Sequence, residues 1–463
     1  MIIATRASPS TGDANASVTF MSAHRVASQA LHCTVMSPRH TRRRFVEGAI
    51  TATVAAAVWR PSLAHAAAGV QQREPGPYES AVLPPGVRSR LLDNINGIRV
   101  HVLEAGFETR NRPGVLLVHG FPELAYSWRH VMPQLAGAGY HVFAPDLRGY
   151  GRTGGTEVAF DDDLTPFRTF NRVTDLVALV SALGYRSVSA VVGHDVGSGI
   201  AGWCAVVRPD IFRSVVMMSA PFGGPPAMPF GTADLPARPA TAPDTIYDEL
   251  ARLTPPRQYY MRYYSTREAN DNMWKAPQGV HAFLRAYYHM KSADWKTNAP
   301  VPLTARTAAE WAKLPRYYVM DLGKGMAQSV AAEMPPPAEI QANRWLSDAA
   351  LSVYAAEYSR TGFQGGLQSY RLGQTPRLNA DLATFSGRTI DQPSMFIGGK
   401  SDWGVYQTPG ALERMQKVAC TRMTGVHLVD GAGHWVQQEQ PEITTRLLLE
   451  FLRNSGAATA ARQ

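Results

Sequence analysis

One pentapeptide, Gly193–Gly197, constrains the fold of this chain more than any other feature. Its sequence is Gly-His-Asp-Val-Gly, and it follows an apolar run, Val188–Val192. The next residues, Ser198–Trp203, are mostly small and suit the first turns of a helix. Small residues on both sides of a sharp strand-to-helix turn allow the central side chain to be held on a strained backbone. We therefore expect a strand, a tight turn at Asp195 and a helix.

The residue on this turn determines the chemistry that it could support. Such turns usually carry a serine nucleophile, whereas this one carries Asp195. A carboxylate that displaces a leaving group from a saturated carbon leaves an ester, which water can hydrolyse at its carbonyl. A serine would leave an ether, which reacts no further. Asp195 thus indicates opening of an epoxide or displacement of a halide. The alternative is an ordinary turn, in which Asp is favoured for local hydrogen bonds.

Apolar and helical segments alternate on both sides of this turn, which indicates an α/β fold with a mostly parallel sheet. We predict strands over 98–104, 115–118, 141–145, 188–192, 213–219, 394–398 and 426–429, and helices over 128–135, 170–183 and 441–452. From 221 to 390 no strand rhythm is visible and aromatic, helix-compatible stretches dominate. This region is predicted to be a mainly helical cap inserted into the sheet domain.

The N-terminus has the organisation of an export signal. Arg42–Arg44 precede an apolar segment, Ala49–Trp59, which is followed by the small-residue site Ala64–Ala66. Paired arginines in this position are typical of the twin-arginine type, and the apolar segment is too short to span a membrane. We expect export to the periplasm or beyond, with Met36 as an alternative start. The predicted domains are 1–66 export signal and upstream extension, 67–220 first part of the core, 221–390 cap and 391–463 second part of the core.

Composition supports a globular protein without a nucleic-acid partner. The chain has 463 residues, of which 45% are hydrophobic, and a formal charge of +9. Seven arginines and two carboxylates in residues 1–66 contribute +5 of that charge, so the rest is only weakly basic. Cys204 and Cys420 remain after the signal, so at most one disulfide could form, and Cys204 is expected as a buried free thiol. No membrane partner is expected.

Four motifs stand at the ends of predicted strands. They are His119–Glu123, the pentapeptide around Asp195, Gly399–Trp403 and Gly431–Trp435. An Asp in the third and a His in the fourth complete the order nucleophile, acid, base along the chain, which is the order of the α/β-hydrolase triad.

Together these motifs resemble the epoxide hydrolase family of the α/β-hydrolase fold. The resemblance covers residues 90–220 and 393–453, and within the cap it is confined to Ser359–Arg371, which resembles the segment that carries a cap tyrosine in the family. It implies the α/β-hydrolase fold, hydrolysis of an epoxide to a vicinal diol, a small apolar epoxide and water as substrates, and no cofactor or metal. The identity of the epoxide and the oligomeric state stay open.

The chemistry of an epoxide hydrolase then suggests a role for each residue of the triad. Asp195 attacks an epoxide carbon, His434 activates the water that hydrolyses the ester, and Asp402 orients and stabilises the imidazole. The backbone N–H groups of Phe121 and Val196 are expected to form the oxyanion hole. His119, Gly120 and Pro122 are expected to order that loop, and the family implies a cis Phe121–Pro122 bond.

Opening the epoxide also requires a proton donor for the leaving oxygen, and the family uses cap tyrosines. Tyr370 matches the second of these tyrosines. For the first, Tyr260 fits best by its spacing, while Tyr259 and Tyr263 remain alternatives. Any of the three could instead be an aromatic residue that packs the cap on the core.

Other polar residues have simpler interpretations. His194 is expected to pack or hydrogen-bond beneath the turn. Glu123 is expected either to position water or the loop, or to lie solvated at a helix start. Asp161–Asp163 are expected in a solvated loop rather than a metal site.

Two other functions remain to be weighed. A haloalkane, haloacid or fluoroacetate-type dehalogenase would use the same Asp nucleophile, but Val196 and Phe121 have side chains that cannot donate a hydrogen bond to a halide. A cap tryptophan could substitute: Trp274, Trp295, Trp311 or Trp345. The third function is non-catalytic binding of a small molecule on a hydrolase scaffold.

Overall fold

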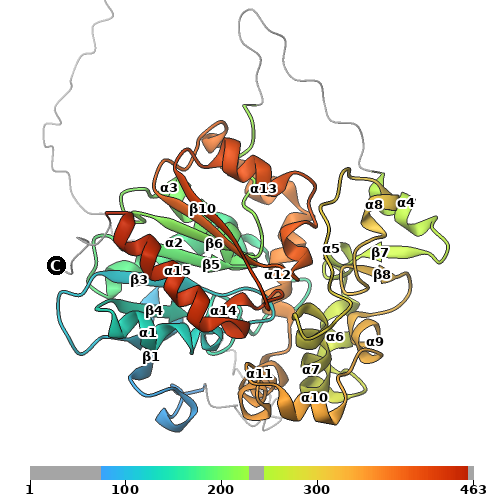
Figure 1. Ribbon diagram of the computed structural model, residues 1–463, viewed down its shortest axis with the longest axis horizontal. Coiled ribbons are helices and arrows are strands. Elements are labelled where there is room, and N and C mark those ends of the chain that lie inside the picture. The colour runs from blue at the N-terminus through green and yellow to red at the C-terminus, as the bar shows by residue number, and fades with distance from the viewer. Residues whose placement is uncertain (1–74, 229–244, 457–463) are drawn as a thin grey trace, which may run out of the picture. The chain divides into compact units, whose positions relative to one another are not determined.

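An eight-stranded, mostly parallel sheet forms the centre of the fold (Figure 1). The computed structural model describes residues 75–228 and 245–456. β2 pairs antiparallel with β1 and β4, and the other neighbours are parallel. In sheet order the strands are β1 (Val87–Ile95), β2 (Ile98–Ala105), β4 (His141–Pro145), β3 (Gly114–Val118), β5 (Ala190–His194), β6 (Val215–Met218), β9 (Ser394–Gly399) and β10 (Met423–Val429).

Helices cover this sheet, and its central strands are correspondingly apolar. α1 packs against α15 and α2 against α3. Every residue of β3, β5 and β6 is buried, as expected for strands that are covered on both faces. The helices and turns that accompany the sheet are η1 (Ser80–Val82), η2 (Ala125–Trp128), α1 (Val131–Gly137), η3 (Thr165–Phe167), α2 (Thr169–Ala182), α3 (Val196–Val207), η5 (Trp403–Val405), α13 (Ala411–Arg414), η6 (Met415–Ala419), α14 (Val436–Glu439) and α15 (Pro441–Asn454).

Between β6 and β9 the chain leaves the sheet and forms a group of mainly helical elements, drawn in yellow-green to orange in Figure 1. They are α4 (Ile246–Ala251), β7 (Arg257–Tyr259), α5 (Tyr260–Tyr263), α6 (Glu268–Trp274), α7 (Gly279–Lys291), α8 (Ala308–Trp311), β8 (Val319–Asp321), α9 (Met326–Ala331), α10 (Pro337–Ala342), α11 (Asp348–Thr361), α12 (Gln364–Gly373) and η4 (Pro376–Phe385). β7 and β8 form an antiparallel ribbon that the sequence analysis did not predict. Its short strands carry no pattern long enough to be recognised.

The predicted α/β class with a mostly parallel sheet is confirmed, and the differences are local. β1 was missed, the predicted helix over 128–135 is divided into η2 and α1, and the strand before the sharp turn ends at His194 rather than Val192. The Phe121–Pro122 bond is cis, as expected. The predicted domain limits stay a prediction.

The predicted export signal lies outside the described residues. Among residues 75–228 and 245–456, no helix is long and apolar enough to cross a membrane. Cys204 and Cys420 are both buried and free, so Cys204 is the buried thiol that was expected.

Parallel strands bring the four motifs together. β3, β5, β6, β9 and β10 run in the same direction, so their carboxyl ends meet at one edge of the sheet. Ligands of open α/β sheets bind beyond this edge. His119, Asp195, Ser219, Lys400 and Asp430 are the residues that immediately follow these strands.

Candidate active site

Asp195 occupies the sharp turn between β5 and α3. Its φ of 53° lies in the left-handed region that a non-glycine residue seldom adopts. The turn is tight because Gly197 allows α3 to approach β3: a Cβ on Gly197 would overlap the carbonyl oxygen of Val118. This strain lifts the Asp195 side chain off the end of the sheet.

The two carboxylate oxygens of Asp195 face different partners. Oδ1 accepts the backbone N–H of Phe121 at 2.9 Å, and Oδ2 lies 3.5 Å from Nε2 of His434. Val196 is the first residue of α3, so its N–H is among those that have no partner within the helix. The Asp195 side chain keeps 11% of its surface accessible, against 1% for His434. One oxygen is therefore held by an amide, while space remains in front of the carboxylate.

Electrostatics keep Asp195 ionised. Burial alone would raise the pKa of this carboxyl, but the hydrogen bond and charge of His434, followed by the charge of Lys291, lower it below its usual value. An ionised carboxylate is the nucleophilic form.

His434 is oriented from the opposite side of its ring. Nδ1 lies 3.1 Å from Oδ1 of Asp402 and 2.7 Å from Oγ of Ser219, and the Ser219 hydroxyl donates to Oδ2 of Asp402. The pKa of Asp402 is lowered because the His434 charge and the hydrogen bonds from His434, Ser219 and Gly404 outweigh its burial. Nε2 on the other side of the ring faces Asp195 at 3.5 Å and has no closer hydrogen-bond partner.

A buried charged pair lies beneath the turn. His194 Nδ1 is 2.5 Å from Oε2 of Glu123, and His194 Nε2 is 2.7 Å from the backbone oxygen of His434. Oε2 of Glu123 also accepts the N–H of Gly120, and Oε1 accepts from Gln437 and Gln438. The solvated position that was one alternative for Glu123 is wrong, because its side chain is fully buried.

Loop residues 119–122 are ordered by the core. His119 Nε2 accepts the N–H of Leu147 at 3.0 Å, and its Nδ1 donates to the carbonyl of Gly120. A Cβ on Gly120 would overlap the Asp195 side chain, so only glycine allows this approach. The Pro122 carbonyl accepts the Tyr288 hydroxyl at 3.0 Å.

Two cap tyrosines pack against each other, and one of them contacts Phe121, whose amide binds Asp195. The rings of Tyr260 and Tyr370 lie 5.9 Å apart, and the Tyr370 ring lies 5.4 Å from that of Phe121. Burial and then the Asp195 charge raise the pKa of Tyr370 well above its usual value, and Asp195 is also among the groups that raise the pKa of Tyr260, after burial and Tyr259. Both hydroxyls therefore stay protonated near neutral pH.

Tyr259 and Tyr263 are placed differently. The ring of Tyr259 packs against Trp311 in a tilted arrangement with ring centroids 4.3 Å apart, and its hydroxyl donates to Gln407 at 3.1 Å. Tyr263 lies near Met326 and Glu268, which act on its pKa. Asp195 is not among the groups that shift either pKa. Of the three candidates only Tyr260 also packs against Tyr370, so Tyr260 stays the predicted first cap tyrosine.

The sequence analysis did not identify three residues that lie near the site. Ser219 bridges Asp402 and His434, Lys291 places a buried cation near Asp195, and Gln407 accepts hydrogen bonds from Tyr259 and Tyr260. Ser219 ends a predicted strand, and a polar residue at that point is a usable signal. Lys291 is one lysine among many, and nothing local distinguishes it.

Among the residues that the structure describes, no group of three His, Cys, Asp or Glu side chains could hold a metal ion. Asp161 is exposed and pairs with Arg267 at 2.5 Å, in agreement with a solvated loop.

The site around Asp195 contains an amide-bound carboxylate, a base and candidate acids. This set suits substitution at carbon followed by ester hydrolysis.

Three of the four cap tryptophans have indole N–H groups that are already hydrogen-bonded within the protein. The indole N–H groups of Trp274, Trp295 and Trp345 donate to Ser359, Glu333 and Asp294, respectively. Only the indole N–H of Trp311 lacks a partner among these four, and that ring packs against Tyr259. Trp274, Trp295 and Trp345 therefore have no indole N–H left to replace the donors that Val196 and Phe121 lack.

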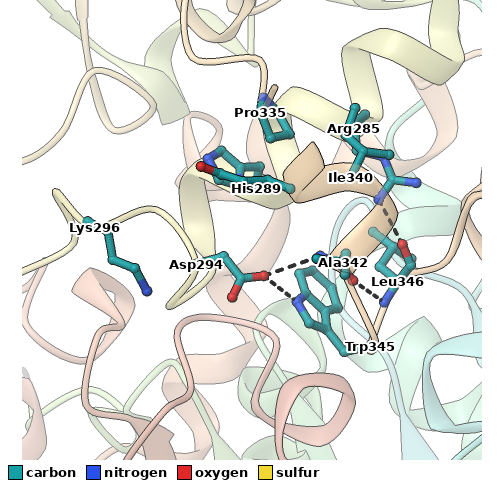
Figure 2. Close-up of a pocket in the computed structure, with 11 residues that line it drawn as sticks. Arg285, His289, Asp294, Lys296, Pro335, Ile340, Ala342, Trp345 and Leu346 are labelled. Carbon is teal, nitrogen blue, oxygen red and sulfur yellow. Dashed lines mark hydrogen bonds between the residues drawn. The ribbon is translucent and has the colours of Figure 1, made fainter. Parts of the chain in front are cut away.

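A hollow on the surface of the cap is distinct from this site. It has a volume of about 290 Å³ and lies between the end of α7 and α10. Figure 2 shows Asp294 directed toward Trp345, whose indole N–H it accepts at 2.8 Å. None of the residues that line the hollow belongs to the group around Asp195.

Comparisons with known proteins agree with the geometry. A family model described as the alpha/beta hydrolase fold matches residues 113–279. Epoxide hydrolase B of Mycobacterium tuberculosis is 32% identical over 369 residues, covering 78% of this chain and 96% of the relative, and Epoxide hydrolase A of the same organism is 34% identical over 368 residues, with the same two coverages.

Solved structures give the same result. An epoxide hydrolase from an endophytic Streptomyces superposes with a TM-score of 0.62 at 32% identity, covering 80% of this chain and 98% of its own. A mutant of potato epoxide hydrolase superposes with a TM-score of 0.60 at 28% identity, covering 80% of this chain and 99% of its own.

Proposed function

The chain belongs to the epoxide hydrolase family of the α/β-hydrolase fold, and we propose that it hydrolyses its epoxide through an ester formed on Asp195. The observation that supports this most is that the two oxygens of the Asp195 carboxylate have different neighbours. Oδ1 is held by the Phe121 amide, and Oδ2 lies 3.5 Å from His434 Nε2. An oxygen that can attack and an imidazole that can later act on the product therefore share one small space.

In the first step Oδ2 forms a bond to an epoxide carbon as the bond between that carbon and the ring oxygen breaks. The released oxygen takes a proton from the hydroxyl of Tyr260 or Tyr370. Because both phenol pKa values are raised, the transient phenolate is a strong base that is reprotonated by the end of the cycle.

In the second step His434 Nε2 takes a proton from water, and the resulting hydroxide attacks Cγ of the Asp195 ester. The negative charge that develops on Oδ1 is stabilised by the amides of Phe121 and Val196, a kind of donor whose removal typically costs about 3–4 kcal/mol of transition-state stabilisation. The bond between Cγ and Oδ2 then breaks, the imidazolium gives its proton to the leaving alkoxide oxygen, and the diol leaves with the former Oδ2. The second proton of the water, left on the Asp195 carboxyl, returns to the tyrosine phenolate and restores the starting state.

Trapping the ester tests this proposal. His434→Gln should accumulate a protein whose mass is increased by that of one epoxide, whereas Asp195→Asn should not. His427→Gln on β10, outside the site, should turn over without accumulating the adduct. A single turnover of the wild type in heavy-oxygen water should place the label in Asp195 and leave the first diol unlabelled. Label in the first diol, or an adduct on Asp195→Asn, would contradict the mechanism.

We also propose that the protein is exported by a twin-arginine signal within residues 1–66. The support is the order of Arg42–Arg44, the apolar segment Ala49–Trp59 and the small-residue site at Ala64–Ala66. Residues 1–66 fused to a folded reporter should carry it out of the cytoplasm of a bacterium with this pathway. Lysine at both Arg42 and Arg43 should abolish transport, whereas Arg39→Lys should not. Transport that survives the double change would refute the twin-arginine type.

A further inference from the structure

The loop that carries His434, residues 433–435, is attached to the cap through its backbone. Lys291 is the last residue of α7, and its carbonyl oxygen accepts the backbone N–H of His434 at 2.7 Å. A Cβ on Gly433 would lie 2.5 Å from the same carbonyl oxygen, so the two backbones are in direct contact and only glycine fits between them. The position of the proposed base is therefore set by a segment of the cap as well as by the sheet.

One side chain joins these two segments. Glu439 ends α14, and its Oε2 accepts the N–H of Ala293 at 2.8 Å and that of Gly433 at 2.9 Å. Its Oε1 accepts the N–H of Trp435 at 3.0 Å. The carboxyl thus binds the residues immediately before and after His434, together with a backbone amide of the cap.

The side chain of Trp435 forms a second link between this loop and α7. Its indole N–H donates to the carbonyl oxygen of Tyr288 at 2.9 Å, and the two rings stack with centroids 4.3 Å apart. The Tyr288 hydroxyl in turn donates to the carbonyl of Pro122. A loop that lost the bonds to Glu439 would stay attached at Trp435, so it would shift rather than detach.

The bonds to Glu439 control a different property of His434 from the one that Asp402 controls. Asp402 and Ser219 contact Nδ1 and orient the ring, whereas the backbone bonds determine where the whole residue lies. In the second step Nε2 must reach a water next to the ester carbonyl, and a displacement of about 1 Å can cost about 10²-fold in rate. Ester formation needs no proton transfer by His434, so the first step should tolerate such a shift.

We propose that Glu439 is a positioning residue for the second step, which holds residues 433–435 against the end of α7 so that Nε2 of His434 meets the water that hydrolyses the ester. This inference rests on the proposed function. Because Ala293 of the cap and Gly433 of the core share one oxygen of Glu439, the cap places the base in addition to supplying the proton donors.

Separate measurement of the two steps tests the proposal. Glu439→Gln keeps one acceptor oxygen and replaces the other by a donor, so ester hydrolysis should slow about three- to tenfold, the loss of one hydrogen bond. Glu439→Ala removes both acceptor oxygens and should slow hydrolysis about a hundredfold. Rapid-mixing kinetics should show an unchanged rate of ester formation in both variants. Glu442→Gln changes an exposed carboxyl in the first turn of α15 and should leave both steps unchanged.

A double variant distinguishes positioning from a general loss of structure. His434→Gln removes the base, and its residual ester hydrolysis should be the same with and without Glu439→Gln, because a residue that acts through the base then has nothing to position. Additive slowing in the double variant, equal slowing of both steps in Glu439→Gln, or unchanged hydrolysis in Glu439→Ala would overturn the inference while leaving ester formation on Asp195 intact. No ester in His434→Gln would instead refute the proposed function.

If the Glu439 variants do not fold, amide hydrogen exchange of the wild type decides. The N–H groups of Ala293, Gly433 and Trp435 should exchange with one common protection, because a single carboxyl binds all three. Separate protection of the cap amide and the two loop amides would overturn the inference.

Discussion

The hydroxyl oxygen of Ser219 lies 2.7 Å from Nδ1 of His434, although 215 residues separate them in the chain. The same hydroxyl donates its proton to Asp402. Ser219 has a φ of 67°, in the left-handed region, directly after β6. The strand end therefore holds a hydroxyl where it fixes both the acid and the base.

Ser219→Ala should slow hydrolysis of the ester more than its formation. The change leaves an oxygen of buried Asp402 without its donor, which costs about 1.5–3 kcal/mol, or roughly a ten- to hundredfold loss of rate. Rapid-mixing kinetics should show an accumulating ester with an unchanged rate of formation. Ser214→Ala removes another buried hydroxyl, which donates to Ser189, and should not accumulate ester. Equal slowing of both steps would contradict a positioning role for Ser219.

Tyr260→Phe and Tyr370→Phe should each reduce the rate of ester formation, because each removes a proton donor for the leaving oxygen. General acid catalysis contributes about 10²–10⁴-fold, and the remaining tyrosine should limit the loss to the lower end of that range. Tyr259→Phe is the matched control, since it removes a neighbouring buried hydroxyl with the same acceptor, Gln407. A loss in Tyr259→Phe that equals the loss in Tyr260→Phe would reassign the first cap tyrosine.

Gly197→Ala should destabilise the fold by about 1–3 kcal/mol or more, because the new Cβ overlaps backbone atoms of β3 that cannot move aside. Gly199→Ala, two residues further along α3, meets nothing within 4 Å and should be neutral or stabilise by up to about 1 kcal/mol. Chemical denaturation of the two variants measures the contrast. Equal stabilities would show that α3 does not approach β3 as described.

The buried pair of Glu123 and His194 should make stability depend on pH. Burial opposes both charges, but each partner outweighs it, so the pKa of Glu123 is lowered from 4.5 and that of His194 is raised from 6.5. The Glu123 contribution is present above pH 4.5 and is lost as pH falls through its folded pKa. The His194 contribution is complete below pH 6.5 and is lost as pH rises through its folded pKa.

The gap in Tm between the wild type and the double variant Glu123→Gln, His194→Gln should therefore be widest between about pH 4.5 and 6.5. It should narrow on both sides of that window. The exposed pair of Glu413 on α13 and Lys417 on η6 provides the control, and its double glutamine variant should track the wild type across the range. A gap that does not vary with pH would mean that the buried pair is not ionised.

Local patterns in the sequence were sufficient for the central part of the fold. Val188–Val192 and the residues around Asp195 predicted a strand, a turn and a helix, and the structure has β5, Asp195 at positive φ and α3 in that order. Such features depend on neighbours in the chain, and a glycine-flanked turn restricts the backbone enough to be recognised.

Features that depend on distant contacts were not recognised. Lys291 is distinguished only by rings contributed by α7, residues 317–318 and Trp435. Glu123 is buried because His194 and Gln437 converge on it from other elements. No periodicity encodes such pairings, which arise only when the sheet brings strand ends together.

Phe121 takes part in two separate contacts, and this limits how the substrate pocket can change. Its amide binds Asp195, the proposed nucleophile, while its ring packs against Tyr370, a proposed proton donor. Remodelling the pocket at Phe121 to admit a bulkier molecule would disturb both chemical steps at once. Adaptation to new molecules, in nature or in the laboratory, should therefore proceed through positions in the cap and leave Phe121, in the loop after β3, unchanged.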